Sequence, residues 1–505
     1  MSSLPTRLRV EHLRDGEPCG VPAPRFSWWL PESSTTQLAW ELEVTGPELT
    51  WTSGRREGGQ SVLVSIGPTL PSPVSGERRR VRVRVWTAAG VSEWSEPASW
   101  VSGLLAPADV SAQWIEPAEP VLPPPGERPG YALRREFQLV DPVTDATVFA
   151  TAHGLYELRL NGSRVGDDEL TPGFTSYRSR LQVQSWNVGE LLVPGRNTIE
   201  VLLTDGWFRG RHGFEREPDG FGNRTAALVE LVARHPDGTT TAVGTDSAWE
   251  SKTTAIRAAD LMDGERIDVG AEGADWLPVN VGSGGLYANR ERLVTSVAPP
   301  VRRIRELAPV SINRLASGSF VVDFGENLSG WIRQGDLGPA GARLVLTHGE
   351  ALAPDGTVST ENIRAFDFAS GTPLPAGQVD EVISAGPGDA FEPRHTTHGF
   401  QFVQIDGHPG PLSGADLRAI VVHTDLDEAG SFECSDARIN ALHAAGVRSF
   451  LGNACDLPTD CPQRERSGFT GDWQVYVGTA AFTHDVAGFS DKWLRDLAAD
   501  QWDNG

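Results

Sequence analysis

From the N-terminus to about residue 425, apolar and polar residues alternate with the period of two that is typical of β-strands. The clearest runs are residues 38–44, 81–86, 155–160, 198–203, 320–324, 343–347 and 402–405. Segments rich in Gly, Ser and Pro separate these runs, and Asn161-Gly162 directly after one of them predicts a tight hairpin turn. The pattern therefore predicts a multidomain, mainly β protein.

Composition shifts along the chain predict where the β domains begin and end. Residues 1–105, with Trp86 and Trp94 in their last strands, are expected to form a fibronectin type III-like β-sandwich. Residues 106–130 are rich in Pro and acidic residues and are expected to be a linker. Residues 131–298 and 299–427 are expected to form two further β-sandwiches.

The period changes to that of a helix at residues 428–505. We expect Ser435 to cap a first helix, and two sets of apolar residues follow at helical spacing: Ile439, Leu442, Val447 and Phe450, then Phe489, Trp493, Leu494 and Leu497. A ring of helical hairpins would begin with this order of elements: a helix, a loop and two further helices. Such a ring needs several hundred residues, so we expect the sequence to be an N-terminal fragment of a longer protein. A complete protein with a small helical cap is the alternative.

Charge and cysteine content narrow the class of partner. The 505 residues carry a formal net charge of −23, which argues against nucleic acid or an anionic membrane surface as a partner and suits a neutral ligand such as a sugar.

The four cysteines are too few and too irregularly spaced for a disulfide framework or a zinc motif, so free thiols are expected. With no long apolar run and no basic, apolar leader, we expect a cytoplasmic location and no membrane contact.

Candidate chemistry is concentrated in residues 456–472, a Pro- and Gly-punctuated loop between the helical segments. It holds four carboxylates, two arginines and an aromatic ring: Asp456, Asp460, Glu465, Asp472, Arg464, Arg466 and Phe469. Glycoside hydrolysis needs one carboxylic acid that protonates the leaving oxygen and one carboxylate that activates water. Glu465 is the candidate acid, because repulsion from Asp460 and Asp472 would favour its protonated form. The arginines would oppose this if they faced it, and an ordinary surface ion pair is the alternative.

Seven further segments accompany this loop along the chain. They are residues 473–475 with 489–496, 154–162, 171–177, 205–210, 323–331, 398–402 and 430–435. As a set, and in the order in which they occur along the chain, they resemble the bacterial α-L-rhamnosidases, glycoside hydrolase family 78. The resemblance covers most of the chain.

The resemblance implies a fibronectin-like module, two β-sandwiches and the start of an (α/α)6 barrel, which together remove terminal α-L-rhamnose with inversion. It implies that Glu465 is the general acid, and that Asp460 and Asp472 hold sugar hydroxyls and tune the acid. Arg464 matches an arginine that contacts the sugar, and Phe469 stands where the family usually has a tryptophan that stacks on it. The family's general base, a glutamate, lies farther downstream than residue 505. We therefore expect this polypeptide alone to be inactive, with no cofactor required.

Two other functions stay open. A six-hairpin glycosidase for another deoxyhexose is one, because Phe469 changes the wall that helps to select the sugar. A noncatalytic, carbohydrate-binding scaffold of several sandwiches is the other. The group attached to the sugar and the oligomeric state are not predicted.

Several other motifs have ordinary explanations. Asp323-Phe324-Gly325 matches a kinase tripeptide by chance, and the spacing of His395 and His398 does not suit a metal site on a strand. Trp207 and Phe208 are expected to fill the space between two sandwiches rather than to stack on sugars.

Overall fold

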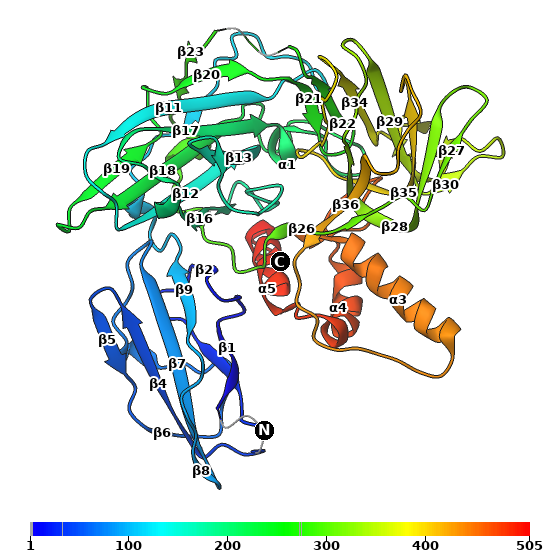
Figure 1. The fold of residues 1–505 in the computed structure, drawn as a ribbon. Helices are drawn as coiled ribbons and strands as arrows, with labels where there is room; N and C mark the ends of the chain where they lie inside the picture. The colour runs from blue at the N-terminus through cyan, green and yellow to red at the C-terminus, as the bar shows by residue number, and fades with distance from the viewer. Residues whose placement is uncertain (1–3, 33, 272, 274, 505) are drawn as a thin grey trace.

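The computed structural model describes residues 4–504 except 33, 272 and 274, so the first three residues of the N-terminus and Gly505 lie outside the described residues. Three β regions and a short helical region follow one another along the chain (Figure 1). No helix in the described part is both long and apolar enough to cross a membrane.

The N-terminal module is a β-sandwich. A two-stranded sheet, β1 (Thr6–Val10) and β3 (Phe26–Trp29), packs with a seven-stranded sheet of β2 (Pro18–Cys19), β9 (Ala98–Ser102), β7 (Arg78–Thr87), β4 (Ala39–Gly46), β5 (Leu49–Thr52), β6 (Arg56–Glu57) and β8 (Gly90–Val91). Val81, Val83 and Val85 alternate into the core as predicted. The intervening Arg82 and Arg84 lie over Trp94 on the outer face, where cation–π contacts half-bury them.

The middle region is a sandwich of two six-stranded sheets around one apolar core. One sheet has the order β16 (Gln184–Asn187), β12 (Asp145–His153), β18 (Ala226–Arg234), β10 (Ile115–Glu116) and β24 (Asn280–Val281), with β19 (Thr240–Gly244) beside β18. The other has β14 (Ser163–Arg164), β13 (Leu155–Leu160), β17 (Gly195–Thr204), β11 (Tyr131–Leu139), β20 (Glu250–Thr253) and β23 (Leu277–Pro278). Asn161 and Gly162 form the predicted turn between β13 and β14, both with positive φ.

A nine-stranded sheet forms the third β region. Its order is β21 (Ile256–Asp260), β22 (Gly264–Asp268), β34 (Val379–Ile383), β29 (Arg343–Gly349), β35 (His398–Asp406), β28 (Phe320–Gln334), β36 (Leu417–Thr424) and β26 (Val301–Leu307), with β27 (Ser311–Arg314) beside β28. The bulged β28 pairs with β35 and, through its second half, with β36. Both halves contribute to one core, so the sheet curls around it.

Two predicted domain boundaries need correction. β10 lies inside the predicted linker 106–130 but pairs with β18 of the middle sandwich, because Ile115 is fully buried there. β21 and β22 lie inside the predicted domain 131–298, yet β22 pairs with β34 of the nine-stranded sheet (Figure 1). The two central β domains are therefore interwoven in sequence.

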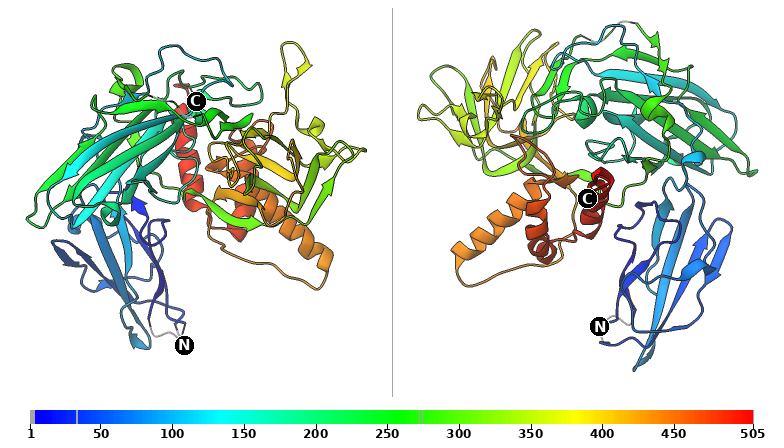
Figure 2. Two further views of the ribbon diagram at one scale, coloured as in Figure 1. Left: turned by 45° about the horizontal axis from the view of Figure 1, so that its top comes forward. Right: turned by 180° about the vertical axis from the view of Figure 1, so that it is seen from behind.

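Three helices complete the chain: α3 (Ala437–Gly452), α4 (Gly471–Thr483) and α5 (Ala487–Asp500). The right-hand view of Figure 2 shows them beneath the two central β regions. The cap of α3 is Asp436 rather than the predicted Ser435, since the Asp436 carboxylate accepts from the amide of Arg438. The helical period was predicted correctly, but Ile439 and Leu442 are exposed and only Phe450 of that set is buried.

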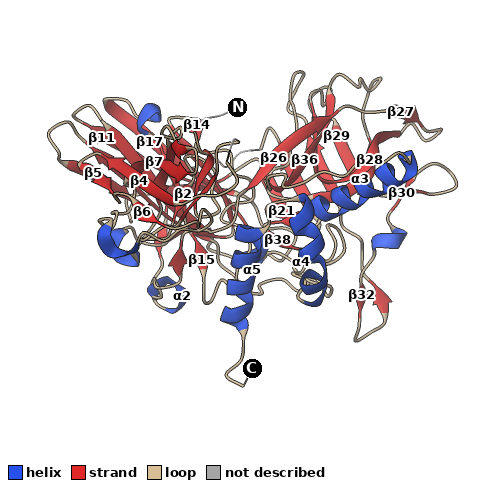
Figure 3. Cartoon of the chain, turned by 90° about the horizontal axis from the view of Figure 1, so that it is seen from below, coloured by secondary structure: helices blue, strands red, loops and turns tan. Residues whose placement is uncertain are grey.

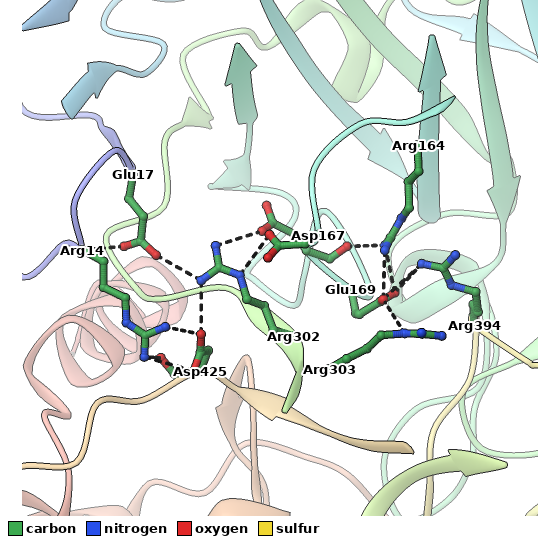
Figure 4. Close-up of polar contacts among 10 residues, drawn as sticks. Arg14, Glu17, Arg164, Asp167, Glu169, Arg302, Arg303, Arg394 and Asp425 are labelled. Carbon is green, nitrogen blue, oxygen red and sulfur yellow. Dashed lines mark hydrogen bonds and ion pairs between the residues drawn. The ribbon is translucent and has the colours of Figure 1, made fainter. Parts of the chain in front are cut away.

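An apolar cluster and an ion-pair network join the regions. Trp207 and Phe208, on the short helix α1 (Gly206–Arg209), pack in one cluster with Trp331 of β28, which confirms that they fill the space between domains. Figure 4 shows the network, in which Arg302 of β26 contacts Glu17 of the N-terminal module at 3.3 Å and Asp167 of the middle sandwich at 3.0 Å. These contacts join the N-terminal module to the two central β regions.

Candidate active site

The candidate acid lies in a hairpin-like loop between the short strands β37 (Ala454–Cys455) and β38 (Leu457–Pro458) and helix α4. The backbone amide of Asp460 donates to the carbonyl of Ser467 at 3.0 Å, and that of Phe469 donates to the carbonyl of Pro458 at 2.9 Å. These bonds close the loop around residues 460–467. Its backbone is therefore held at both ends, as the prolines and glycines predicted.

Arg466 anchors the loop to the nine-stranded sheet and its neighbour. Its buried guanidinium donates to the carbonyl of Leu261, to the Thr397 hydroxyl at 3.2 Å and to the Gln378 side-chain oxygen at 3.3 Å. Burial lowers the pKa of Arg466 to about 10. Its two terminal nitrogens are thus engaged in the β domains rather than with Glu465, so Arg466 does not oppose protonation of the acid through a direct ion pair.

Asp456 anchors the start of the loop, although the sequence counted it among the candidate chemical groups. Its buried carboxylate accepts from the backbone amide of Phe174 at 2.6 Å, from the Gln182 amide at 3.2 Å and from Lys492 Nζ at 2.9 Å. Lys492 also donates to the carbonyls of Phe174 and Asp456. This group of four residues, the Asp456 knot, ties α5 to the middle sandwich.

A close approach of Trp493 fixes the other end of the loop. The indole Nε1 donates to the carbonyl of Phe469 at 3.2 Å, and a Cβ on Gly468 would lie 2.1 Å from the ring. Only glycine allows this contact. The loop is thus clamped by the β domains on one side and by α5 on the other.

Glu465 lies within this clamped loop beside three side chains. Arg464 Nη2 is 3.6 Å from Glu465 Oε1 and 4.0 Å from Asp460 Oδ2, and Cys461 Sγ is 3.9 Å from Glu465 Oε1. The Glu465 side chain is 17% exposed, so it is screened from bulk water but reachable. Burial raises the pKa of Asp460; Arg464 opposes the shift and Asp472 adds to it. The structure therefore brings Glu465, Asp460 and Arg464 together.

The other two predicted residues face a cavity next to this group. A cavity of about 340 Å³ lies between α3, α4 and the loop, and Asp460, Phe469 and Asp472 line it together with Trp473 and Tyr476. Asp472 is exposed in the first turn of α4. Glu465 and Arg464 do not line this cavity, so Asp460 connects the two groups.

Two sets of three side chains in the described part of the chain have ligand atoms within 4.8 Å of one another. One is Asp460, Cys461 and Glu465. The other is His348, Asp380 and His398, fully buried in the nine-stranded sheet, where His398 Nε2 is 3.0 Å from Asp380. The two imidazoles stack at 4.0 Å and 18°, so their in-plane lone pairs lie in two separate, nearly parallel planes and do not converge on one ion. His395 bonds to Thr204 instead, so it forms no site with His398.

Four family models match the chain. They describe a Rha78A-like N-terminal immunoglobulin domain (residues 5–106), an α-L-rhamnosidase N-terminal domain (141–306), a bacterial α-L-rhamnosidase concanavalin-like domain (313–423) and a bacterial α-L-rhamnosidase six-hairpin glycosidase domain (427–505). The chain belongs to the bacterial α-L-rhamnosidases of glycoside hydrolase family 78. The mainly β fold with a hairpin glycosidase domain is confirmed, and the first module is of the immunoglobulin type.

Individual relatives agree with the family models. An α-L-rhamnosidase of Streptomyces avermitilis is 34% identical over 87% of this chain and 43% of its own length, and one of Formosa agariphila is 30% identical over 95% and 54%. The structure of an Aspergillus terreus α-L-rhamnosidase superposes with a TM-score of 0.90 at 34% identity, covering 98% of this chain and 58% of that one. The chain spans about half the length of the curated relatives it matches.

Sequence reasoning missed the Asp456 knot and the Arg466 anchor. One signal was available for the knot: Lys492 is one of only two lysines in a chain with 44 basic residues. A compact ammonium suits a point where one cation must reach several oxygens. For Arg466, no local signal separates it from Arg464, because its partners come from distant segments.

Proposed function

We propose that this protein is an α-L-rhamnosidase that removes terminal, non-reducing α-L-rhamnose from rhamnosides by inverting acid/base hydrolysis. The observation that carries the proposal is the half-buried Glu465 beside Asp460 and Arg464, in a loop clamped from both sides. Its segment matches the hairpin glycosidase domain of the family. A Streptomyces avermitilis relative, 26% identical, has been solved in complex with L-rhamnose, which supports the choice of sugar.

Glu465 is proposed to donate its proton to the departing oxygen. An inverting pair of carboxyl groups is about 6.5–9.5 Å apart, which leaves room for the attacking water. Asp460 and Glu465 oxygens lie within 4.8 Å, so Asp460 is too close to be the base. We assign Asp460 and Asp472 to sugar hydroxyls and to tuning of the acid, and Arg464 to orienting Glu465 and the sugar.

The general base is proposed to lie in the part of the relatives' length that this chain does not span. An acid without its base cannot complete inversion, so the 505-residue chain alone is expected to hydrolyse rhamnosides very slowly or not at all. A cytoplasmic location stays a prediction from the sequence.

The phenylalanine at position 469 is the reason to consider a second sugar as the substrate. It lines the cavity beside Asp460 and Asp472, where a phenyl ring covers less of a sugar's apolar face than the tryptophan usual in the family. A glycosidase for another deoxyhexose is therefore the second candidate.

A panel of 4-nitrophenyl glycosides tests both candidates on the protein produced from its complete gene. We expect the α-L-rhamnoside to be cleaved with the highest kcat/KM, and proton NMR of the first product to show the β anomer. Preferential cleavage of the L-fucoside would replace the proposal with the second candidate. An α product would refute inversion.

A further inference from the structure

Two phenylalanines from different β domains form a partly exposed stacked pair near the candidate acid. The ring of Phe214 comes from the loop after α1 in the middle sandwich, and that of Phe368 comes from a hairpin of the nine-stranded region. Their centroids are 4.9 Å apart and their planes are 25° apart. Phe368 is nevertheless 69% exposed, so one of its faces is open to a further ring.

The Phe214 side of the pair is held by a tight turn. The backbone amide of Arg216 donates to the carbonyl of Gly213 at 3.1 Å, and both residues have positive φ. The Arg216 guanidinium is buried and donates to the carbonyl of Ala376 at 2.6 Å. Phe214 is therefore presented at the tip of an anchored turn rather than on a loose loop.

The Phe368 side is held by a two-stranded finger, β32 (Phe366–Asp367) and β33 (Thr372–Pro373), which projects from its domain (Figure 3). Asp367 closes the tip: its carboxylate accepts from the amide of Ala369 at 2.8 Å and from the Ser370 hydroxyl at 2.6 Å. A large apolar side chain at such a tip gains little from folding, because most of it stays in water.

Arg464 connects the aromatic pair to the acid. Its guanidinium carbon lies 5.4 Å from the Phe214 ring centroid, while its Nη2 lies 3.6 Å from Glu465 Oε1. A Cβ on Gly213 would lie 3.6 Å from the Ser467 hydroxyl, so the turn itself touches the loop of the acid. The aromatic pair therefore lies beside Glu465, on the side where Arg464 contacts it.

We propose that Phe214 and Phe368 form a stacking platform for the group attached to the rhamnose, and that the preferred group is a planar aromatic aglycone of the phenol class. This assignment rests on the proposed function. The two phenyl rings carry no hydrogen-bonding atoms, so they cannot recognise sugar hydroxyls by hydrogen bonds. They can, however, stack in an offset arrangement on a flat aromatic ring.

Binding to the chain itself tests the platform independently of catalysis. Saturation-transfer NMR with 4-nitrophenyl α-L-rhamnoside is expected to show strong transfer to the nitrophenyl protons in wild type, and to lose most of it in F368A. F368Y keeps a ring and should restore the transfer. F366A alters a half-exposed phenylalanine of the same finger and is the matched control, expected to behave as wild type.

Kinetics of the protein from the complete gene give the second readout. F368A is expected to raise KM for the nitrophenyl rhamnoside about 3- to 10-fold, the range that one aromatic contact supplies, and to change KM for methyl α-L-rhamnoside less than about twofold. Unchanged nitrophenyl transfer and an unchanged ratio of the two KM values in F368A would overturn the platform. An equal rise for both substrates would also overturn it.

The same data separate failure of the platform from failure of the proposed function. Hydrolysis of rhamnosides without any dependence on Phe368 would refute the platform and leave the function intact. No hydrolysis of any rhamnoside, with nitrophenyl transfer that still depends on Phe368, would refute the function and leave an aromatic binding site. Stronger transfer from a disaccharide than from the nitrophenyl compound would mean that a sugar ring, and not a phenol, is the occupant.

Discussion

Asp456 and Glu465 belong to the same acidic loop, yet they differ in burial and in the number of hydrogen-bond donors around them. This difference distinguishes a carboxylate that stabilises the fold from one that can take part in catalysis. Asp456 is buried and has three donors within 3.2 Å, one of them an ammonium. Glu465 is partly exposed, and its nearest cation is 3.6 Å away. The three donors to Asp456 all meet Oδ2 and commit this carboxylate to holding the fold, whereas the longer contacts of Glu465 leave it available to a ligand. The number of acidic residues in a loop therefore does not indicate which of them is the catalytic acid.

The largest expected effect on stability is at the Asp456 knot. Lys492→Met leaves the Asp456 carboxylate buried without its cation, and we expect the free energy of unfolding to fall by about 3–5 kcal/mol, as for other broken buried pairs. Urea unfolding of the chain measures this. Arg495→Met on the same helix removes the exposed pair with Asp491 and is the control, expected to cost under about 1 kcal/mol. Equal costs for the two variants would mean that the knot is not structural.

A somewhat smaller loss is expected at the other anchor. Arg466→Met removes the buried donor to Leu261, Thr397 and Gln378, and stranding these acceptors should cost about 2–3 kcal/mol in urea unfolding. Arg464→Met, two residues earlier, removes ion pairs of 3.6–4.0 Å and a cation–π contact with Phe214, and should cost under about 1 kcal/mol. A reversed order would show that Arg464, not Arg466, holds the loop.

Glu265 is a fully buried acid whose contribution to stability should depend on pH. Burial first, and then repulsion from Asp380, raise the pKa of Glu265 to about 8, against the opposing effect of backbone amides and Arg394. Between the unfolded value near 4.5 and about 8, the folded state binds the extra proton, so the stability that Glu265 supports is complete at low pH and is lost as pH rises. Glu265→Gln should flatten the fall in unfolding free energy between pH 5 and 8. An unchanged slope would contradict this.

The smallest expected effect on stability is at Glu465. Glu465→Gln keeps the shape of the side chain and loses only long ion pairs, so the free energy of unfolding should change by less than about 0.5 kcal/mol. A loss above about 2 kcal/mol would place Glu465 with Asp456 among the structural acids.

Local patterns predicted most strands and the neighbours of the candidate acid, because both depend on residues close in sequence. The alternation in β7 and β17 and the Asn161-Gly162 turn appear as expected. Pairing of β22 with β34 joins residues far apart in the chain and left no local signal. The same holds for Lys492 with Asp456. The helical period predicted the position of α3 correctly. It did not predict which of its apolar residues are buried, since Leu442 is exposed.

The most direct test of the account is the leaving-group dependence of Glu465→Gln in the protein from the complete gene. An alkyl rhamnoside needs a proton on its departing oxygen, so its kcat should fall about 10²- to 10⁴-fold, whereas a dinitrophenyl rhamnoside, which leaves as a stable anion, should lose far less. Equal rates of the variant and wild type on the alkyl substrate, or equal losses on both substrates, would contradict the assignment of Glu465 as the general acid.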